Sequence, residues 1–371
     1  MTTLPLVYLI PVLALCFGHT IYNISSLGGH GQINENSYYR ALPCPNPEDI
    51  APCGCSYYDG AMSMSCMDIE DEDELYKVFH SLIPIPTFGR LTLPGGRITT
   101  LNNTVFGDAT FESVYITCLG HPYYCTARLT TIGPNTFMKS ASTLRHLEMM
   151  VTRLSEFPFD TLSEYEKLDF FMVWFGNFPT FPIINSESLQ TLVFKLSSIR
   201  EIQAHALDGL PNLTYFDSLM NPIDVVAKDV FAPLPNLQKL NVQLGSRLRH
   251  LHSHQFAVTS ANVSIQLYSN DIESVGPDTF SGENASGSEL SYNTSVFIRK
   301  EPASLDPNWE TIVHKTLPSK DKSRTGNNLT CGCDIAWLVL EPTYHPLVPD
   351  ATCHSGELLV GLDPSFYEIF C

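Results

Sequence analysis

Residues 209–242 read GLPNLTYFDSLMNPIDVVAKDVFAPLPNLQKLNV, and one short pattern occurs twice within this stretch. Each copy has the form Pro-Asn-Leu-x-x-apolar, and the final apolar residues, Phe216 and Leu240, are 24 positions apart. Self-similarity at a fixed period of this length is typical of repeat proteins. We therefore searched for the same pattern on both sides of this stretch.

Apolar pairs separated by one residue recur along the middle of the chain. They begin 23, 33, 21, 24, 24, 24 and 25 residues apart, and further apolar residues follow most of them at +7, +10 and +15. Ser218 is the polar member of an otherwise apolar set. The eight pairs are Leu91/Leu93, Val114/Ile116, Leu147/Met149, Leu168/Phe170, Leu192/Phe194, Phe216/Ser218, Leu240/Val242 and Ile265/Leu267.

A period near 24 with an apolar-x-apolar centre predicts a leucine-rich-repeat solenoid of the α/β class. Each unit would supply one short strand, a turn and an irregular return, and stacked units would share one core. We expect a horseshoe of about eight to nine repeats over 88–294, with a parallel sheet on its concave face and a possible ninth strand at Leu290/Tyr292. The usual Asn five places after the strand start occurs only as Asn221 and Asn270, so we expect uneven curvature.

The first residues predict export from the cell. An apolar run from Leu4 to Phe17 is too short to span a bilayer comfortably, and Gly18 follows it. We interpret 1–18 as a signal peptide and 19–43 as a flexible tail, with a buried N-terminal helix as the alternative. No later segment reads as a membrane span. The formal net charge of −18 argues against a nucleic-acid partner.

Cysteines and sequons support an extracellular compartment. Eleven cysteines are present, and removing Cys16 with the signal leaves ten, which predicts five disulfides. Seven Asn-x-Ser/Thr sequons predict glycosylation: Asn23, Asn102, Asn212, Asn262, Asn284, Asn293 and Asn328.

Two cysteine quartets flank the repeats, where an open solenoid needs caps. Neighbours one residue apart would be strained if bonded to each other, so each must reach a distant partner. The expected pairs are Cys44–Cys55, Cys53–Cys66, Cys331–Cys353, Cys333–Cys371 and, closing a small loop, Cys118–Cys125. A four-thiolate zinc site is the alternative, but its cysteines usually stand two to four residues apart. We assign 44–87 and 331–371 to the caps and 295–330 to an irregular connection.

A helix is expected in each cap. DEDELYKVFHSL, from Asp71, places Leu75, Val78, Phe79 and Leu82 on one helical face. DIAWLVLEP, from Asp334, predicts a capping helix with Asp334 as its N-cap and with Trp337 and Leu338 facing the last repeat.

The frame CPNPEDIAPCGC (Cys44–Cys55), the helix after Cys66 and the segment Cys331–Cys371 carry a specific resemblance. They resemble the secreted arthropod leucine-rich-repeat proteins typified by the non-catalytic subunit of oplophorus-luciferin 2-monooxygenase. The resemblance covers nearly all of the mature chain. It implies a subunit that accompanies and stabilises a small catalytic chain, which oxidises coelenterazine with oxygen to give light. Relatives in non-luminous animals imply a more general protein-binding role.

The sequence offers little chemistry of its own. His250, His252 and His254 lie around the repeat-core residue Leu251, and side chains that alternate in this way do not converge on a metal. No Ser-His-Asp arrangement, zinc-protease motif or phosphate-binding glycine loop is present. We expect no catalytic residue, no metal and no cofactor, although a site scattered across repeats is not excluded.

Partner binding is the better hypothesis, and the residues beside the strand cores are its candidates because strand side chains alternate between two faces. Aromatics mixed with both charge signs suit a protein partner, whereas any solvated sheet face could have this composition. The insertion CLGHPYYC, from Cys118, is a second candidate or else a cover for the second repeat. Sequons at Asn262 and Asn293 favour strands three to seven. The candidates are Tyr115, Tyr123, Tyr124, His146, Glu148, Lys167, Asp169, Phe171, Lys195, Tyr215, Asp217, Lys239 and Tyr268, with Asn241 and Gln266 beside them.

Three functions remain open at this point. The first is a secreted, non-catalytic subunit that binds or stabilises another extracellular protein. The second is a stand-alone recognition or matrix protein, and the third is a hydrolase or metal enzyme.

Overall fold

We describe the fold from a computed structural model of the chain. It describes residues 44–58, 60–81, 83, 86–117, 128–150, 153–244, 247–260, 263–267, 270, 272–276, 279–280, 295–297, 330–340, 342, 345 and 352–371. All of these belong to one of two compact units, the one formed by 43–301 and 325–371. The expected signal peptide and tail lie outside the described residues, as does the pair Cys118–Cys125.

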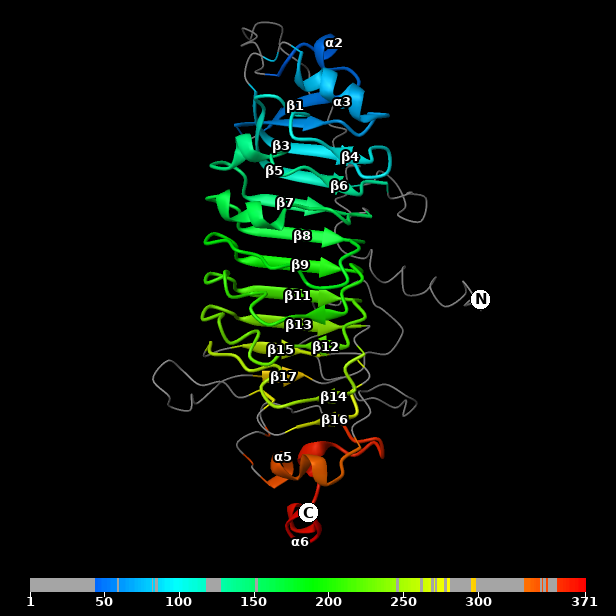
Figure 1. The fold of residues 1–371 in the computed structure, drawn as a ribbon, viewed down its shortest axis with the longest axis vertical. Coiled ribbons are helices and arrows are strands. Elements are labelled where there is room, and N and C mark those ends of the chain that lie inside the picture. The colour runs from blue at the N-terminus through cyan, green and yellow to red at the C-terminus, as the bar shows by residue number, and fades with distance from the viewer. Residues whose placement is uncertain are drawn as a thin grey trace, which may run out of the picture. The chain divides into compact units, whose positions relative to one another are not determined.

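One sheet of eleven strands runs through the described part of the chain (Figure 1). Its first two strands form an antiparallel hairpin, and every later strand pairs in parallel with the one before it. The strands, in sheet order, are β1 (Gly54–Tyr58), β2 (Ala61–Ser65), β3 (Thr87–Pro94), β5 (Thr110–Thr117), β7 (His146–Met149), β8 (Phe170–Trp174), β9 (Thr191–Lys195), β11 (Tyr215–Leu219), β13 (Lys239–Gln243), β15 (Ser264–Gln266) and β17 (Ser295–Phe297).

Every second side chain of a repeat strand points into the core. In β9, Leu192 and Phe194 are fully buried, and the register aligns them with Phe216 and Ser218 of β11. Because successive side chains of a strand point to opposite faces, these residues form one continuous inner layer. The predicted leucine-rich-repeat solenoid is confirmed.

The returns stack against one another behind this layer. Short bridges join them, and phenylalanine rings stack from one return to the next, as Phe231 does on Phe256 with ring centroids 5.7 Å apart. Stacked and edge-on aromatic contacts of this kind bury large apolar areas in the core. The elements of the returns are β4 (Thr100–Leu101), β6 (Thr131–Ile132), η3 (Met138–Ser140), η4 (Phe159–Glu164), β10 (Glu201–Ile202), β12 (Val225–Val226), β14 (His250–Leu251) and β16 (Ser274–Val275).

The polar residues inside the repeats satisfy backbone groups at the turns. Asn221 accepts a hydrogen bond from the backbone N–H of Ser197 (2.7 Å) and donates to the carbonyl of Phe194 (2.8 Å) in the preceding repeat. It also donates to the hydroxyl of Ser218 (2.9 Å), which explains how a polar residue is accepted in a core position.

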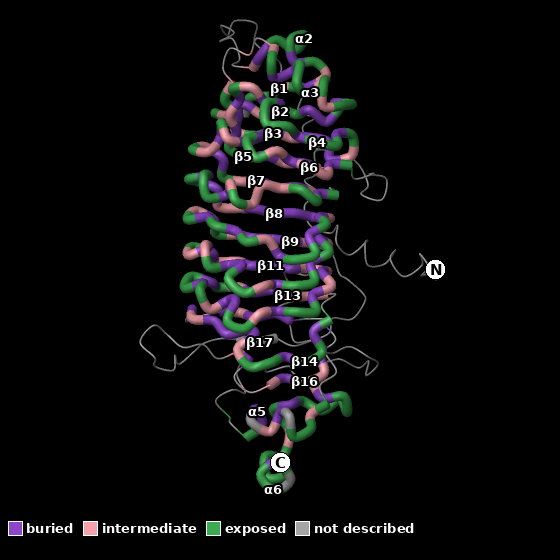
Figure 2. The backbone as a smooth tube through the Cα atoms, in the orientation of Figure 1, coloured by how far each residue is buried: buried purple, intermediate pink, exposed green. Residues whose placement is uncertain are grey.

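The fourth repeat departs from the expectation. Its core residues are Phe171 and Val173, both fully buried, and not Leu168 and Phe170. Leu168 is buried too, but it stands at the leading apolar position that Leu189 occupies in the next repeat. The third and fourth intervals are therefore 24 and 21 residues rather than 21 and 24. In Figure 2 the β8 tube is buried along most of its length.

The last strand also differs from the expectation. Val296 of β17 pairs with Ile265 of β15, so the ninth repeat strand lies at 295–297 rather than at Leu290/Tyr292.

The N-terminal cap consists of the strands β1 and β2 with the helices α2 (Pro47–Ile50) and α3 (Glu72–Phe79). As expected, Leu75, Val78 and Phe79 are buried on one face of α3, while Leu82 lies outside the described residues. Glu72 fixes this helix to the first repeat by accepting hydrogen bonds from the backbone N–H groups of Thr99 (2.5 Å) and Thr100 (2.9 Å).

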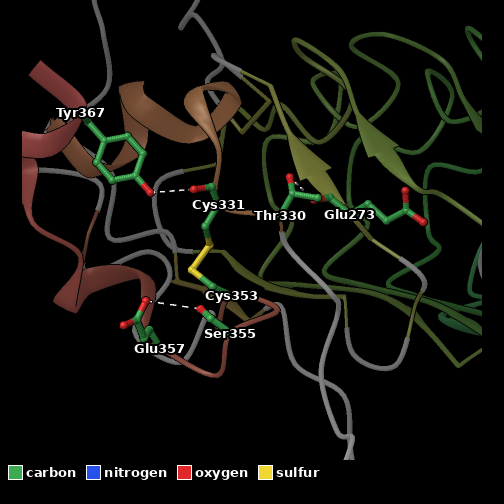
Figure 3. The surroundings of a disulfide bond; sticks show 7 residues. All are labelled: Glu273, Thr330, Cys331, Cys353, Ser355, Glu357 and Tyr367. Atoms are coloured by element: carbon green, nitrogen blue, oxygen red, sulfur yellow. Dashed lines mark hydrogen bonds between the residues drawn. A yellow bond between two sulfur atoms is a disulfide. The ribbon is translucent and has the colours of Figure 1, made fainter. Parts of the chain in front are cut away.

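The C-terminal cap contains η5 (Cys333–Ile335), α5 (Ala336–Leu340), η7 (Leu359–Gly361) and α6 (Pro364–Phe370). Ile335, Leu338 and Val339 are buried, and the residue before the first turn is Gly332 rather than the expected N-cap Asp334. The backbone N–H of Thr330 donates to the carbonyl of Glu273 (3.0 Å), which joins the cap to the last return (Figure 3).

Disulfides close both caps. The structure contains Cys44–Cys55 and Cys53–Cys66 at the N-terminal end and Cys331–Cys353 and Cys333–Cys371 at the C-terminal end. These are four of the five expected pairs. In Figure 3 the hydroxyl of Tyr367 also donates to the carbonyl of Cys331 (2.7 Å), so helix α6 is tied to the same cysteine.

Candidate partner-binding face

The sheet has one side packed on the core and one side that faces away from it, which we call the open face. Alternation along the strands and the register between them arrange its side chains in rows that cross the sheet. The first row is Arg90, Ser113, His146, Phe170, Thr191, Tyr215, Lys239 and Ser264, and the second is Thr92, Tyr115, Glu148, Met172, Val193, Asp217, Asn241 and Gln266.

Four side chains stack on the first strands of the open face. The guanidinium of Arg90 lies 4.5 Å from the ring centroid of Tyr115, whose ring stacks on His146 at 4.8 Å. His146 stacks in turn on Phe170, with centroids 4.1 Å apart and an interplanar angle of 5°. The His146 ring also contacts the carboxylate of Glu148 at 3.0 Å. Stacking of this kind holds flexible side chains in one arrangement.

Two lysines cover aromatic rings further along the sheet. The ammonium of Lys195 lies 5.6 Å from the ring of Trp174, and that of Lys239 lies 5.3 Å from the ring of Tyr215. Both distances are within the range of cation–π attraction.

A buried carboxylate lies between these two lysines. Asp217 is 6% exposed, and its Oδ2 accepts a hydrogen bond from the hydroxyl of Tyr215 (3.2 Å). Burial raises the pKa of Asp217, while Lys195, the Tyr215 hydrogen bond and Lys239 act in the opposite direction. Asn241, 3% exposed, donates its amide to the same Tyr215 oxygen (3.0 Å).

The structure places seven of the predicted partner-binding residues on the open face. These are Tyr115, His146, Glu148, Lys195, Tyr215, Asp217 and Lys239. Tyr123, Tyr124 and Tyr268 lie outside the described residues.

Phe171 was predicted wrongly, because it is a fully buried core residue of β8. Lys167 and Asp169 do not lie on the open face either. They lie in the turn before β8, where they line a polar depression of about 280 Å³ with Arg145 and Glu187. All three errors follow from the register of the fourth repeat.

The sequence reasoning missed Arg90, Phe170 and Met172 as members of the open face. The leading apolar residue three positions before most strand cores would have located Phe170 and Met172, whereas Arg90 stands directly before the correctly placed core residue Leu91. Aligning Leu168 with this position instead of with the core moves Phe170 to the open face. The other leading residues are Phe88, Phe111, Leu144, Leu189, Leu213 and Leu237.

Two sequons lie within the described residues, and both asparagines are exposed. Asn102 accepts a hydrogen bond from the backbone N–H of Thr104 (3.0 Å), and Asn212 donates to the carbonyl of Glu187 (2.8 Å). Both lie at turns, outside the two rows of the open face.

The histidines near Leu251 do not converge. His250 bonds to the hydroxyl of Ser274 (2.8 Å), and His254 lies 3.2 Å from a carboxylate oxygen of Asp229, while His252 is exposed. Within the part of the chain that the structure describes, no group of three or more His, Cys, Asp or Glu side chains could hold a metal. None of the described helices is long and apolar enough to cross a membrane.

The comparisons with known proteins give the family. No protein-family model matches the chain. The chain is 30% identical over 340 residues to the oplophorus-luciferin 2-monooxygenase non-catalytic subunit of Oplophorus gracilirostris, covering 90% of this chain and 89% of the relative. The chain belongs to the family of that subunit.

The expected resemblance is thereby confirmed, and the name of the relative describes a subunit without catalytic activity. Among solved structures, the chain is similar to one from the Toll–Spatzle complex of Drosophila, with a TM-score of 0.43 and 13% identity. That similarity covers 79% of this chain and 43% of the other.

Proposed function

We propose that this chain is a secreted, non-catalytic subunit that binds and stabilises another extracellular protein, of the luciferin monooxygenase type. The observation that carries the proposal is the 30% identity over nearly the whole chain with a protein named as the non-catalytic subunit of such an enzyme. The shared length covers 90% of this chain, so the proposal concerns most of the architecture rather than one motif.

The open face supports a binding role. It combines stacked aromatics with Arg90, and aromatic and arginine side chains dominate the energetics of protein interfaces. Its stacked and hydrogen-bonded side chains are held before binding, which lowers the entropy lost when a partner docks. We propose Tyr115, His146, Glu148, Lys195, Tyr215, Asp217 and Lys239 as contact residues, and Arg90 and Phe170 as additions to that set.

Secretion is supported by the chemistry of the caps. Four disulfides close the two ends of the solenoid, and bonds of this kind persist in oxidising compartments. The apolar N-terminal run and the seven sequons agree with the same compartment. We propose that 1–18 is removed on export and that Cys118 and Cys125 form a fifth disulfide.

Gentle purification of the protein from its own tissue tests this function. Mass spectrometry would identify every protein that co-elutes at a fixed ratio, and the same fractions would be assayed for light after addition of coelenterazine and oxygen. We expect a companion chain at constant stoichiometry, together with oxygen-dependent light.

A glycosylated chain that elutes alone and gives no light would contradict the proposal. It would favour a stand-alone extracellular recognition protein. A companion without light would keep the binding role and remove the luciferin monooxygenase assignment.

A further inference from the structure

The centre of the open face contains two buried hydrogen-bond acceptors on neighbouring strands. Among the described residues, Asn241 Oδ1 is one of the buried side-chain atoms that have no hydrogen-bond partner. Its neighbour in the register is Asp217, whose carboxylate accepts a single hydrogen bond there, at Oδ2 from Tyr215. We call the group Tyr215, Asp217 and Asn241 the acceptor recess.

An unpartnered buried acceptor destabilises the free protein, because its lost hydration is not replaced. An apolar residue would fit the same position, since Val193 stands in the same row two strands away and is only 3% exposed. The amide nitrogen of Asn241 is used within the fold, since it donates to the Tyr215 oxygen (3.0 Å), but its Oδ1 is left without a donor. A bound hydrogen-bond donor would satisfy that oxygen.

The spacing of the two acceptors selects the donor. Neighbouring strands lie about 4.8 Å apart. A single –NH₂ group with two hydrogen bonds of about 2.9 Å at trigonal angles bridges acceptors about 5 Å apart. A primary amide therefore matches the pair. A cationic donor fits less well, because Lys195 and Lys239 already place two positive charges beside Asp217.

The same two lysines indicate what surrounds the amide. Lys195 stands two residues beyond Val193, and Lys239 stands two residues before Asn241, so Lys195, Asp217 and Lys239 lie on a diagonal across β9, β11 and β13. Each diagonal step spans about 8 Å. Alternate side chains of an extended strand are about 7 Å apart and point the same way. One extended segment can therefore reach all three positions.

We propose that the open face binds an extended acidic segment of a partner protein, in which an Asn or Gln side chain enters the acceptor recess between two carboxylates that pair with Lys195 and Lys239. This proposal rests on the proposed function, which supplies the partner protein, and adds which kind of segment of that partner is bound. The segment would have the form acid-x-amide-x-acid.

Short dye-labelled peptides test the recess directly, with the full-length secreted chain and fluorescence anisotropy as the readout. The first peptide is Glu-Thr-Gln-Thr-Glu. The second replaces Gln by Met, which has similar length but no donor, and the third replaces both Glu by Lys. We expect the first to bind at least about tenfold more tightly than the second, since one buried hydrogen-bonded group is lost, and the third to bind most weakly.

Variants locate the binding on the recess. Asn241→Val should abolish the difference between the Gln and Met peptides. Thr191→Val, a substitution of the same kind on the same face, should leave it unchanged. Lys195→Gln with Lys239→Gln should weaken both acidic peptides equally and keep their ratio. If Asn241→Val fails to fold, the double lysine variant still tests whether the acidic peptides bind at this face.

Equal binding of the Gln and Met peptides to the unmodified chain, or no binding of either, would overturn the proposal. A chain that elutes as a dimer, loses the dimer in Asn241→Val and binds no peptide would assign the face to a second copy. These outcomes can be distinguished from those that test the proposed function. If a companion co-purifies but neither peptide binds, the peptide-binding proposal is wrong and the proposed function stands. If the chain elutes alone but binds the Gln peptide, the proposed function is wrong and the peptide-binding proposal stands.

Discussion

Among the charged residues that the structure describes, Asp217 is the one that is buried. Desolvation raises its pKa, so its charged form is disfavoured in the folded state relative to the unfolded state. A group of this kind lowers stability as the pH rises from its ordinary value through its raised folded value, and the loss is complete above that. Asp217 therefore weakens the free fold at neutral pH.

Replacing Asp217 by Asn should stabilise the protein at neutral pH by about 1 kcal/mol, because the amide keeps an acceptor for Tyr215 without a buried charge. The gain should shrink as the pH falls, since the native carboxyl is then protonated. Urea denaturation of both proteins over a pH series measures this. A gain that is constant with pH would contradict the raised pKa of Asp217, and a loss at neutral pH would show that Asp217 is stabilised as a charge.

The register of the fourth repeat is tested by two adjacent phenylalanines. Phe171→Ala removes a fully buried ring from the core and should cost about 3–5 kcal/mol. Phe170→Ala removes a half-buried ring that stacks on His146 and should cost about 1 kcal/mol or less. Thermal or urea denaturation of the two variants decides the matter, and the reverse order would contradict the register described here.

Among the structural elements, the two caps contain the described disulfides, and the two bonds of the N-terminal cap can be compared directly. Cys53–Cys66 and Cys44–Cys55 close loops of similar separation, 13 and 11 residues. Cys53 and Cys66 are buried, whereas Cys44 and Cys55 are half-buried. The two bonds therefore constrain the unfolded chain almost equally and differ in what they contribute to packing.

Removing either pair as a double Ala variant should cost about 3 kcal/mol through the lost constraint. The Cys53/Cys66 variant should lose more than the Cys44/Cys55 variant, because it also leaves a cavity in the cap core. Comparison of the two melting temperatures measures the difference. Equal losses would mean that the buried sulfurs add no packing energy.

The repeats and the disulfide pairs of the caps could be predicted from the sequence, because both depend on local spacing. The fourth repeat could not be placed correctly, since Leu168, Phe170, Phe171 and Val173 are all apolar and a pattern of apolar positions does not distinguish them. The strand at 295–297 was missed because 31 residues separate Val296 from Ile265, and no period predicts that interval. Both errors are shifts of register rather than of fold.

The acceptor recess could not be predicted from the sequence. Asp217, Tyr215 and Asn241 were recognised as residues of the predicted sheet face. Their hydrogen bonds, and the acceptor left without one, depend on the register between β11 and β13. A prediction from spacing alone contains no such information.

At the scale of the whole molecule, the positive charges on the open face contrast with the negative net charge of the chain. The chain carries a net charge of −18, yet three cations, Arg90, Lys195 and Lys239, are held over aromatic rings on the open face. The returns carry exposed lysines as well, such as Lys139, which pairs with Asp108 at 2.8 Å, and Lys228 near Asp229. Lys195 and Lys239 therefore probe the open face, whereas Lys139 and Lys228 probe the returns.

Acetylation of lysines, read by mass spectrometry with and without the bound companion chain, tests the central claim most directly. If the partner docks on the open face, modification of Lys195 and Lys239 should fall several-fold in the complex, while Lys139 and Lys228 react as in the free chain. Protection of Lys139 and Lys228 with Lys195 and Lys239 unchanged would place the partner on the returns and contradict the account.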